Sequence, residues 1–275
     1  MAAVLKENNY DVEILNWHNI NATPEKIKDI IVEKKPEVIG FSILHGNRWG
    51  GIEIARIAKT IDPTVTIVFG GVGATFLWEH FLSHFSEVDY VVIGEGEHTF
   101  LNLVKHLESD HLQKIETLNG LAYRKNGQAF RTADAAAVNR LDDLPDPAKY
   151  FTYQHLSLTR GCAGNCNFCG SPRFWGRNVR FHSADYFVGQ LQRLYQKGIR
   201  FFYFSDDTFT VDKKLFAKKN RHRRDPKCFR PDPEIRYHGP GLFYLRLPAR
   251  KPANHPGYQG PDRPNQTFEC GLLYS

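Results

Sequence analysis

The chain has 275 residues, of which 41% are hydrophobic and 24% are charged, as in an average globular protein of one large or two ordinary domains. No apolar run reaches the roughly 18 residues of a membrane span and no secretory signal precedes the five cysteines, which excludes a membrane-spanning chain and favours the reducing cytoplasm over a disulfide framework. The net charge of +6 belongs wholly to residues 216–275, where 12 basic residues stand against 5 acidic ones, so nucleic acid is not an expected partner of the rest of the chain.

Short apolar strand candidates alternate with amphipathic helix candidates along the first 107 residues. The strands are expected at 12–17, 38–43, 65–71 and 90–94, and the helices from Thr23-Pro24 onward and at 50–61, 74–85 and 98–107. Because these strands are apolar on both faces, they predict a parallel sheet covered by helices on each side. The alternation predicts a doubly wound, Rossmann-like α/β domain over residues 1–140. Residues 2–8 read as the end of a helix, from which we expect a truncation at the amino terminus.

The α/β domain is expected to end in a hairpin at 121–132, turned at Asn126-Gly127. A polar, proline-containing linker follows at 141–154. A second domain is then expected over residues 155–215. Its elements are a strand at 155–160, a cysteine-rich loop, a helix at 183–196 and a strand at 201–207.

Residues 216–275 form a basic tail that contains 9 of the 15 prolines. Proline at this density blocks helices and sheet interiors. The abrupt change to Arg, Pro and His is what translation in a wrong reading frame produces, so we expect a tail that is non-native or disordered and a chain truncated at both ends. A functional basic arm is the alternative.

The stretch RGCAGNCNFCG at 160–170 places Cys162, Cys166 and Cys169 within eight positions. Spacings of four and three residues allow the thiolates to converge on one small inorganic centre from a single loop. The glycines of the loop let the backbone turn tightly and leave N–H groups free to face cluster sulfurs. A cubane cluster with one open iron fits three cysteines.

Zinc is the alternative metal for this loop. Structural zinc usually has four protein ligands, and the usual pattern has two CxxC-like pairs. A fourth ligand would have to come from His155, His182 or Cys228.

The CxxxCxxC loop, with Phe168 just before its last cysteine and a strand just before the loop, resembles the signature of the radical S-adenosylmethionine (SAM) superfamily. In that family three cysteines hold a 4Fe-4S cluster, and the amino and carboxylate groups of SAM bind the fourth iron. The resemblance implies that Cys162, Cys166 and Cys169 are metal ligands and that the second domain begins a partial (β/α) radical SAM barrel. It also implies an external electron donor such as a flavodoxin or ferredoxin.

The resemblance implies further contacts to SAM. Phe168 would lie near the adenine, with plain packing as the alternative. Asp206 or Asp207, at the end of the strand at 201–207, would bind the ammonium group, with a loop-capping role as the alternative. Arg180 and Ser183 are expected to form a salt bridge and a helix N-cap, respectively.

Two short motifs stand at strand ends in the first domain, where the ligands of doubly wound sheets bind. Ser42-x-Leu44 ends one strand and Gly70-Gly71 ends the next. Together with Gly94-Glu95-Gly96-Glu97 they resemble the cobalamin-binding domain that precedes the SAM domain in one large radical SAM subfamily. The resemblance implies that Ser42, Leu44, Gly70 and Gly71 line the groove for the nucleotide tail of cobalamin.

One departure from other cobalamin proteins is the absence of the DxHxxG motif, whose histidine ligates cobalt. Ile43 and Arg48 stand where His45 would need Asp and Gly, so we expect His45 to be a surface residue. Trp49 and Trp78 could flank a macrocycle but are expected to belong to helix packing.

The resemblance covers about residues 1–215 and implies a cobalamin-dependent radical SAM enzyme that cleaves SAM reductively. Such an enzyme would transfer a methyl group to a small-molecule substrate, or would rearrange or cyclise it. An RNA methylthiotransferase is the second hypothesis, but that family carries additional cysteines in its N-terminal domain and residues 1–150 contain none. The third is a non-catalytic fragment that binds cobalamin or a metal.

Overall fold

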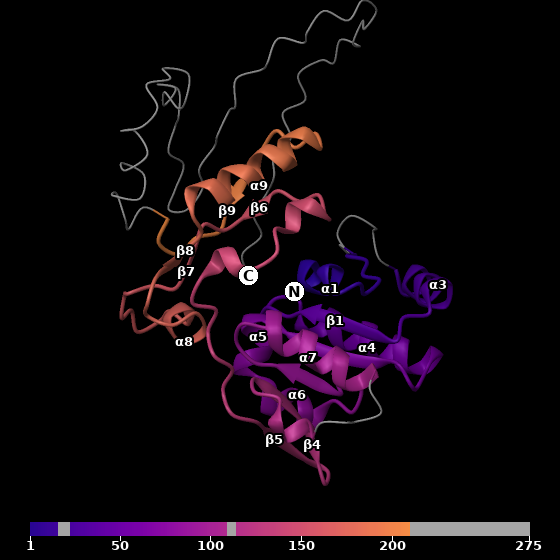
Figure 1. The fold of residues 1–275 in the computed structure, drawn as a ribbon. Helices are drawn as coiled ribbons and strands as arrows, with labels where there is room; N and C mark the ends of the chain where they lie inside the picture. Colours follow the sequence, from indigo (N-terminus) through magenta and orange to yellow (C-terminus); the bar gives the residue numbers. More distant parts are fainter. Residues whose placement is uncertain (16–22, 109–113, 210–275) are drawn as a thin grey trace, which may run out of the picture.

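The computed structural model describes residues 1–15, 23–108 and 114–209 (Figure 1). Within these ranges the helices are α1 (Ala2–Glu7), α3 (Pro24–Lys34), α4 (Arg48–Ile61), α5 (Gly71–Phe76), α6 (Trp78–His84), α7 (Glu97–Glu108), α8 (Ser171–Phe174) and α9 (Ala184–Gln196). The strands are β1 (Val38–Ser42), β2 (Thr66–Gly70), β3 (Tyr90–Val92), β4 (Leu121–Lys125), β5 (Gln128–Arg131), β6 (His155–Leu156), β7 (Thr159–Arg160), β8 (Arg180–Phe181) and β9 (Tyr203–Phe204). Short 3₁₀ turns occupy Ile115–Thr117, Leu141–Asp143 and Pro147–Lys149. The predicted tail, 216–275, lies outside the described residues.

The largest sheet has the strand order β1-β2-β3-β4-β5 (Figure 1). Strands β1, β2 and β3 are parallel, and the hairpin of β4 and β5 adds two antiparallel strands beside β3. The hairpin turns at Asn126 (φ 51°) and Gly127 (φ 78°), as predicted, because a two-residue hairpin turn of this hand needs positive φ at both positions. The predicted α/β fold class is confirmed.

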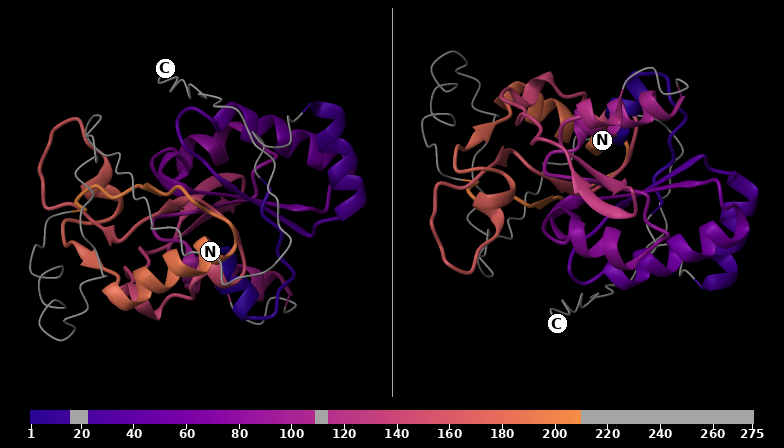
Figure 2. Two further views of the ribbon diagram at one scale, coloured as in Figure 1. Left: turned by 90° about the horizontal axis from the view of Figure 1, so that it is seen from above. Right: turned by 90° about the horizontal axis from the view of Figure 1, so that it is seen from below.

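Side chains of the parallel strands alternate between two buried faces. Ile67 and Phe69 enter a core that is completed by α3, α4 and α6, whereas Val68 and Val92 enter a second core with α7. The two views of Figure 2 show helices on both sides of the strands. Thr23 begins α3 as predicted, since its Oγ1 accepts a hydrogen bond from the N–H of Lys26 at 3.3 Å.

Two predicted elements of the first domain are wrong. Residues 12–15 of the strand expected at 12–17 are not in a strand, and the remainder lies outside the described residues. Val12 packs instead against the apolar cluster that α1 forms with α7, and this contact partly buries it without a strand partner. The single helix expected at 74–85 is two helices, because Leu77 (φ −115°, ψ 19°) leaves the helical conformation between α5 and α6.

The second domain is made of short strands. β6 and β9 pair in parallel and β7 and β8 pair antiparallel, so the strand predicted at 155–160 is divided between two sheets and the one predicted at 201–207 is reduced to β9. The division arises because the Asp206 carboxylate accepts hydrogen bonds from the backbone N–H groups of Leu158 and Thr159 and turns the chain there. Ser183 caps α9 as predicted, since its Oγ accepts from Tyr186 N at 3.1 Å. None of the helices in the described part of the chain has the length and apolar character that crossing a membrane requires.

Close backbone packing between α5 and the end of β1 gives a test of the first domain. A methyl group on Gly73 would lie 2.9 Å from the carbonyl oxygen of Ile43, whereas one on Gly50, at an exposed position of helix α4, would meet nothing within 4 Å. We expect Gly73→Ala to destabilise the protein by roughly 1–3 kcal/mol. Gly50→Ala is the matched control and should leave stability unchanged or raise it by up to about 1 kcal/mol. Chemical denaturation measures both, and equal stability of the two variants would contradict the packing described here.

Candidate functional site

The cysteine loop runs from β7 to α8. Cys162 N–H donates to the carbonyl of Gly176 at 3.2 Å, and Cys169 N–H donates to the carbonyl of Cys166 at 3.2 Å. Gly161 adopts φ +103°, and a side chain there would collide with the carbonyl oxygen of Asn178. The backbone that presents the first cysteine therefore requires glycine just before it.

The three thiols are free, with Cys166 exposed and Cys162 and Cys169 half-buried. A Cβ atom placed on Gly164 would lie 3.3 Å from Cys162 Sγ and 3.8 Å from Cys166 Sγ. These two sulfur atoms therefore flank the space that glycine leaves open in the loop. Within the described ranges no three potential ligand side chains are already gathered as a metal site, so the cysteines would have to turn toward a common centre on binding. The donor set and the open space fit an iron–sulfur cluster.

The fourth ligands considered for zinc are engaged elsewhere or lie outside the described residues. His182 Nδ1 lies 3.1 Å from Asp142 Oδ1, and the His182 ring stacks on Tyr186 with centroids 4.2 Å apart. The ring of His155 stacks on Tyr203 at 4.7 Å. Cys228 is not among the described residues.

The side chains predicted to contact SAM have three different environments. Phe168 is 93% exposed at the tip of the loop, which does not fit plain packing. Asp207 accepts a hydrogen bond from Ser171 Oγ, at the start of α8. Asp206 Oδ1 accepts from Leu158 N at 2.8 Å and from Thr159 Oγ1 at 2.7 Å, which is the loop-capping role. Its Oδ2 is buried without a partner, and burial raises the pKa of Asp206 above its ordinary value.

The residues predicted to line the cobalamin groove gather at the carboxyl ends of β1 and β2. Ser42 and Gly70 are register partners across the two strands, and both Ser42 and Leu44 are exposed. Gly71 (φ +88°) allows α5 to begin close to the end of β1, since a Cβ there would lie 3.1 Å from Ile43 O. The side chain of Asn47 holds this turn by accepting from Leu44 N at 2.7 Å and donating to Ser42 O at 2.9 Å.

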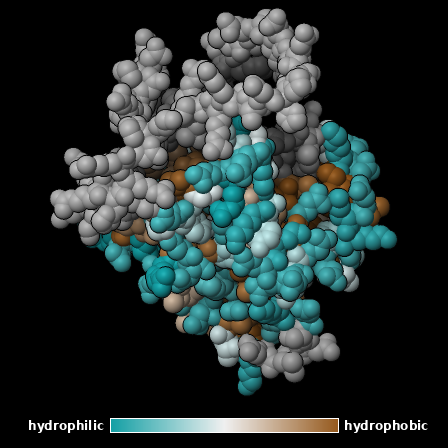
Figure 3. All heavy atoms as spheres, turned by 45° about the horizontal axis from the view of Figure 1, so that its top comes forward, coloured by the Kyte–Doolittle hydropathy of each residue, from teal (hydrophilic) through white to brown (hydrophobic). Residues whose placement is uncertain are grey.

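The groove edge and the cysteine loop are neighbours. A Cβ placed on Gly170 would lie 3.3 Å from the ring of Phe76, on α5, so this helix touches the loop. Leu44, Trp49 and Phe76 are 56%, 57% and 46% exposed. In the view of Figure 3 the described surface is mostly hydrophilic, with hydrophobic residues in separate areas.

The other aromatic and histidine residues of this edge follow the predictions in part. His45 is exposed, as expected of a surface residue. Trp78 packs against the main apolar core, as expected of a helix-packing residue. Trp49 is more exposed than predicted, although its ring meets Phe85 edge-on with centroids 6.2 Å apart.

Four charged side chains meet between the two domains. Arg160 Nη2 lies 2.6 Å from Glu97 Oε1, and Arg160 Nη1 lies 3.1 Å from Glu95 Oε2. Arg180 Nη2 lies 2.5 Å from Glu95 Oε1, and its Nη1 donates to Val138 O at 2.7 Å. The exposed fractions of the four charged side chains lie between 5% and 17%, so this interdomain network of Glu95, Glu97, Arg160 and Arg180 is largely withdrawn from water.

Burial and charge act in opposite directions within the interdomain network. Burial raises the pKa of Glu97, but the charge and hydrogen bond of Arg160 outweigh it and hold this pKa below its ordinary value. Burial lowers the pKa of Arg160, but the charges and hydrogen bonds of Glu97 and Glu95 outweigh this effect and hold the pKa above its ordinary value. Both partners are therefore charged at neutral pH, and removing one would leave a buried charge uncompensated at a cost of roughly 3–5 kcal/mol.

Sequence motifs singled out Arg180 as a salt-bridging residue but did not single out Arg160 or Asn47. The sequence signal that could have indicated the pairing role of Arg160 is its position directly before Gly161 and the first cysteine. The two carboxylates of Gly94-Glu95-Gly96-Glu97 are the matching signal, because they follow β3 at the sheet edge where the domains meet.

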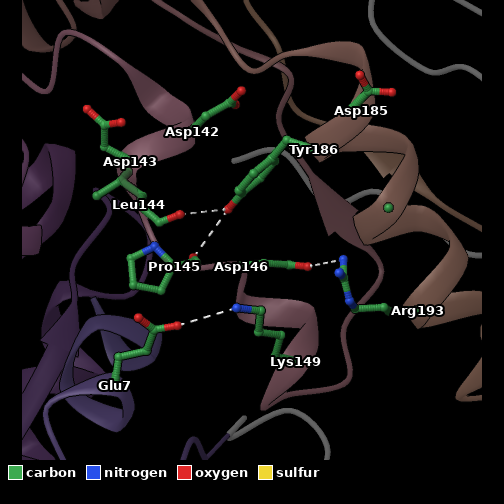
Figure 4. Close-up of a pocket in the computed structure, with 11 residues that line it drawn as sticks. Glu7, Asp142, Asp143, Leu144, Pro145, Asp146, Lys149, Asp185, Tyr186 and Arg193 are labelled. Carbon is green, nitrogen blue, oxygen red and sulfur yellow. Dashed lines mark hydrogen bonds and ion pairs between the residues drawn. The ribbon is translucent and has the colours of Figure 1, made fainter.

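A pocket of about 380 Å³ lies between the 3₁₀ turns of the linker and α9 (Figure 4). Asp146 Oδ2 lies 2.6 Å from Arg193 Nη1, and Glu7 Oε1 lies 3.5 Å from Lys149 Nζ. The hydroxyl of Tyr186 donates to two carbonyl groups of the linker. These contacts join the linker to α1 and α9. Because the polar groups around the pocket are engaged with one another, we assign the pocket no ligand.

Two family models match the chain. The B12 binding domain matches residues 1–104, and the Radical SAM superfamily matches residues 156–243. The second match begins at β6, includes the cysteine loop and runs past residue 215, the predicted end of the second domain. The fold and the site thus define a protein with a cobalamin-type α/β domain joined to a three-cysteine loop. The chain belongs to the B12-binding radical SAM proteins.

The chain is similar to two curated proteins over most of its length. It is 31% identical over 226 residues to an uncharacterized methyltransferase of Pyrococcus horikoshii, across 78% of this chain and 49% of that protein. It is 27% identical over 222 residues to the anaerobic magnesium-protoporphyrin IX monomethyl ester cyclase of Cereibacter sphaeroides, across 74% of this chain and 36% of that protein. The chain thus spans half or less of the length of these relatives.

A solved structure supports the same fold. The radical SAM methyltransferase TsrM from Kitasatospora setae matches with a TM-score of 0.66 and 16% sequence identity, across 80% of this chain and 47% of that chain. At this identity the similarity shows the fold alone, which is an α/β domain followed by a second domain that carries the cysteine loop.

The buried imidazole of His182 predicts a pH dependence of stability. Burial lowers the pKa of His182 below its ordinary value, although Asp142 opposes this shift. The unfolded chain therefore binds a proton below about pH 6.5 that the folded chain does not bind, and stability is lost as the pH falls through this range.

We expect His182→Gln to lose less stability than the wild-type protein between about pH 6.5 and 5, because it lacks this protonation step. Denaturant titrations at several pH values measure the difference. His45→Gln, at an exposed position, is the matched control. Equal slopes for His182→Gln and the wild-type protein would contradict a buried neutral imidazole.

Proposed function

We propose that this protein acts as a cobalamin-dependent radical SAM enzyme on a small-molecule substrate. The observation that carries the proposal is the cysteine loop, in which Cys162 and Cys166 flank the open space at Gly164. Gly170, directly after Cys169, touches α5 of the B12-binding domain. Cys162, Cys166 and Cys169 would hold a 4Fe-4S cluster, which when bound supplies the electron for reductive cleavage of SAM.

The residues of the chain would bind, orient and exclude water around these cofactors. Phe168, exposed at the loop tip, is available to cover the adenine of SAM. Asp207 lies beside Ser171 at the start of α8 and is better placed for the ammonium group than Asp206, whose Oδ1 is committed to the turn between β6 and β7. On the other side, Ser42, Leu44 and the glycines at the ends of β1 and β2 would line the groove for the cobalamin tail.

Methyl transfer and cyclisation are both reactions of similar proteins, because the relatives include a methyltransferase and an anaerobic cyclase. The free thiols and a strongly reducing cluster favour a reducing compartment such as the cytoplasm, with a flavodoxin or ferredoxin as electron donor. A non-catalytic cobalamin- or metal-binding module is the alternative, and it would bind cobalamin or a metal without cleaving SAM.

The cluster assignment is tested by anaerobic reconstitution with iron and sulfide. We expect about four irons per chain in the wild-type protein and near-background iron in Cys162→Ala, Cys166→Ala and Cys169→Ala, because each variant removes one ligand. Cys228→Ser is the matched control and should retain the wild-type iron content. Full iron content in any of the three loop variants, or zinc in the wild-type protein, would contradict the assignment.

The cobalamin groove is tested at Leu44, which is 56% exposed beside the end of β1. Leu44→Asp should weaken hydroxocobalamin binding at least tenfold, since a carboxylate would be desolvated against the bound ligand. Val32→Asp is the matched control, because Val32 is 55% exposed on α3. Absorbance titration gives both dissociation constants, and equal affinity of Leu44→Asp and wild type would overturn the location of the groove.

A further inference from the structure

The interdomain network lies directly beside the cysteine loop. Glu95 precedes α7 and Glu97 is its first residue, in the domain that matches the B12-binding family. Arg160 is the last residue of β7, two positions before Cys162, and Arg180 begins β8, the partner of β7. The network thus joins the sheet edge of one domain to the strand that leads into the metal loop of the other.

A chain of short contacts runs from the network to the first cysteine. The guanidinium of Arg160 lies over the ring of Trp175, 5.1 Å from its centroid, and Arg180 Nη2 donates to Trp175 O at 2.9 Å. The next residue, Gly176, accepts the hydrogen bond from Cys162 N–H. Both arginines therefore hold the segment against which the Cys162 backbone is fixed.

Local backbone geometry leaves little freedom between these contacts. Gly161 has φ +103° and its Cα faces the carbonyl groups of Asn178 and Gly176 so closely that no side chain fits. Only Gly161 separates Arg160 from Cys162, so a shift of Arg160 relative to Glu97 would be passed directly to the backbone of Cys162. On the other side of the network, the segment that carries Glu95 and Glu97 is held at Gly94, whose N–H donates to Thr75 Oγ1 on α5 at 2.9 Å.

We propose that Arg160 is a positioning residue, which fixes the cysteine loop against the B12-binding domain through its paired contacts with Glu95 and Glu97. This inference rests on the proposed function, because Arg160 would set the position of the cluster relative to the cobalamin groove. In this role Arg160 does not need to touch a cofactor. It acts through Trp175 and Gly176 on the backbone of Cys162.

Hydrogen exchange of the metal-free full chain tests the positioning role without any cofactor. We expect amide exchange in residues 161–176 to be at least tenfold faster in Arg160→Gln than in wild type, and faster to a smaller extent in Glu97→Gln, where Glu95 remains. Arg56→Gln is the matched control, since Arg56 pairs with Glu87 at 2.9 Å and lies 5.9 Å from the ring of Phe85, remote from the loop. It should leave exchange in 161–176 unchanged.

A second readout separates positioning from general stability. In reconstituted protein with wild-type iron content, Arg160→Gln should change the electron paramagnetic resonance spectrum of the reduced cluster, and Arg160→Lys, which keeps the charge, should restore part of the wild-type spectrum. If Arg160→Gln does not fold by circular dichroism, Glu97→Gln decides the question in the same two assays.

Wild-type exchange in residues 161–176 of a folded Glu97→Gln or Arg160→Gln variant would overturn the inference. So would an unchanged spectrum in an Arg160→Gln variant that holds full iron. Failure of the wild-type protein to bind iron would instead contradict the proposed function, while the exchange comparison would still decide whether Arg160 positions the loop.

Discussion

A buried charge pairing between domains is the constraint on which the arrangement of both candidate sites depends. Glu97 and Arg160 come from different domains and meet at 2.6 Å in a setting largely withdrawn from water. A charge buried there needs an opposite partner, so the contact between the two domains depends on the guanidinium of Arg160 together with the carboxylates of Glu95 and Glu97. The contact also lies where β3 ends and where the cysteine loop begins, so it ties the loop to the carboxyl end of that strand.

Glycine provides the second half of this arrangement. At Gly71 and Gly161 positive φ values and near backbone neighbours exclude other residues, and these positions lie at the groove and at the metal loop, respectively. Arg160, directly before Gly161, ties the start of the cysteine loop to the interdomain network. Phe168 and Cys166 are exposed on the cysteine loop, and Cys162 and Cys169 are half-buried beside them.

Much of the fold was predictable from the sequence, because apolar periodicity and caps are local signals. The helix capped by Thr23, the hairpin at Asn126-Gly127 and the parallel strands β1, β2 and β3 are of this kind. The division of the strand expected at 155–160 was not predictable in this way. It depends on Asp206, some fifty positions later, whose carboxylate accepts hydrogen bonds from the turn. Arg160 was likewise missed as a functional residue, since its partners lie more than sixty positions earlier in the chain. Long-range polar contacts of this type leave no periodic pattern.

We propose that the loop RGCAGNCNFCG holds a 4Fe-4S cluster that binds SAM beside the B12-binding domain. Electron paramagnetic resonance of the reduced, reconstituted chain with and without SAM tests it most directly, since SAM that binds the open iron must perturb the cluster. We expect a reduced-cluster signal whose line shape changes on addition of SAM. A cluster signal that SAM leaves unchanged, or a folded protein without iron, would contradict it.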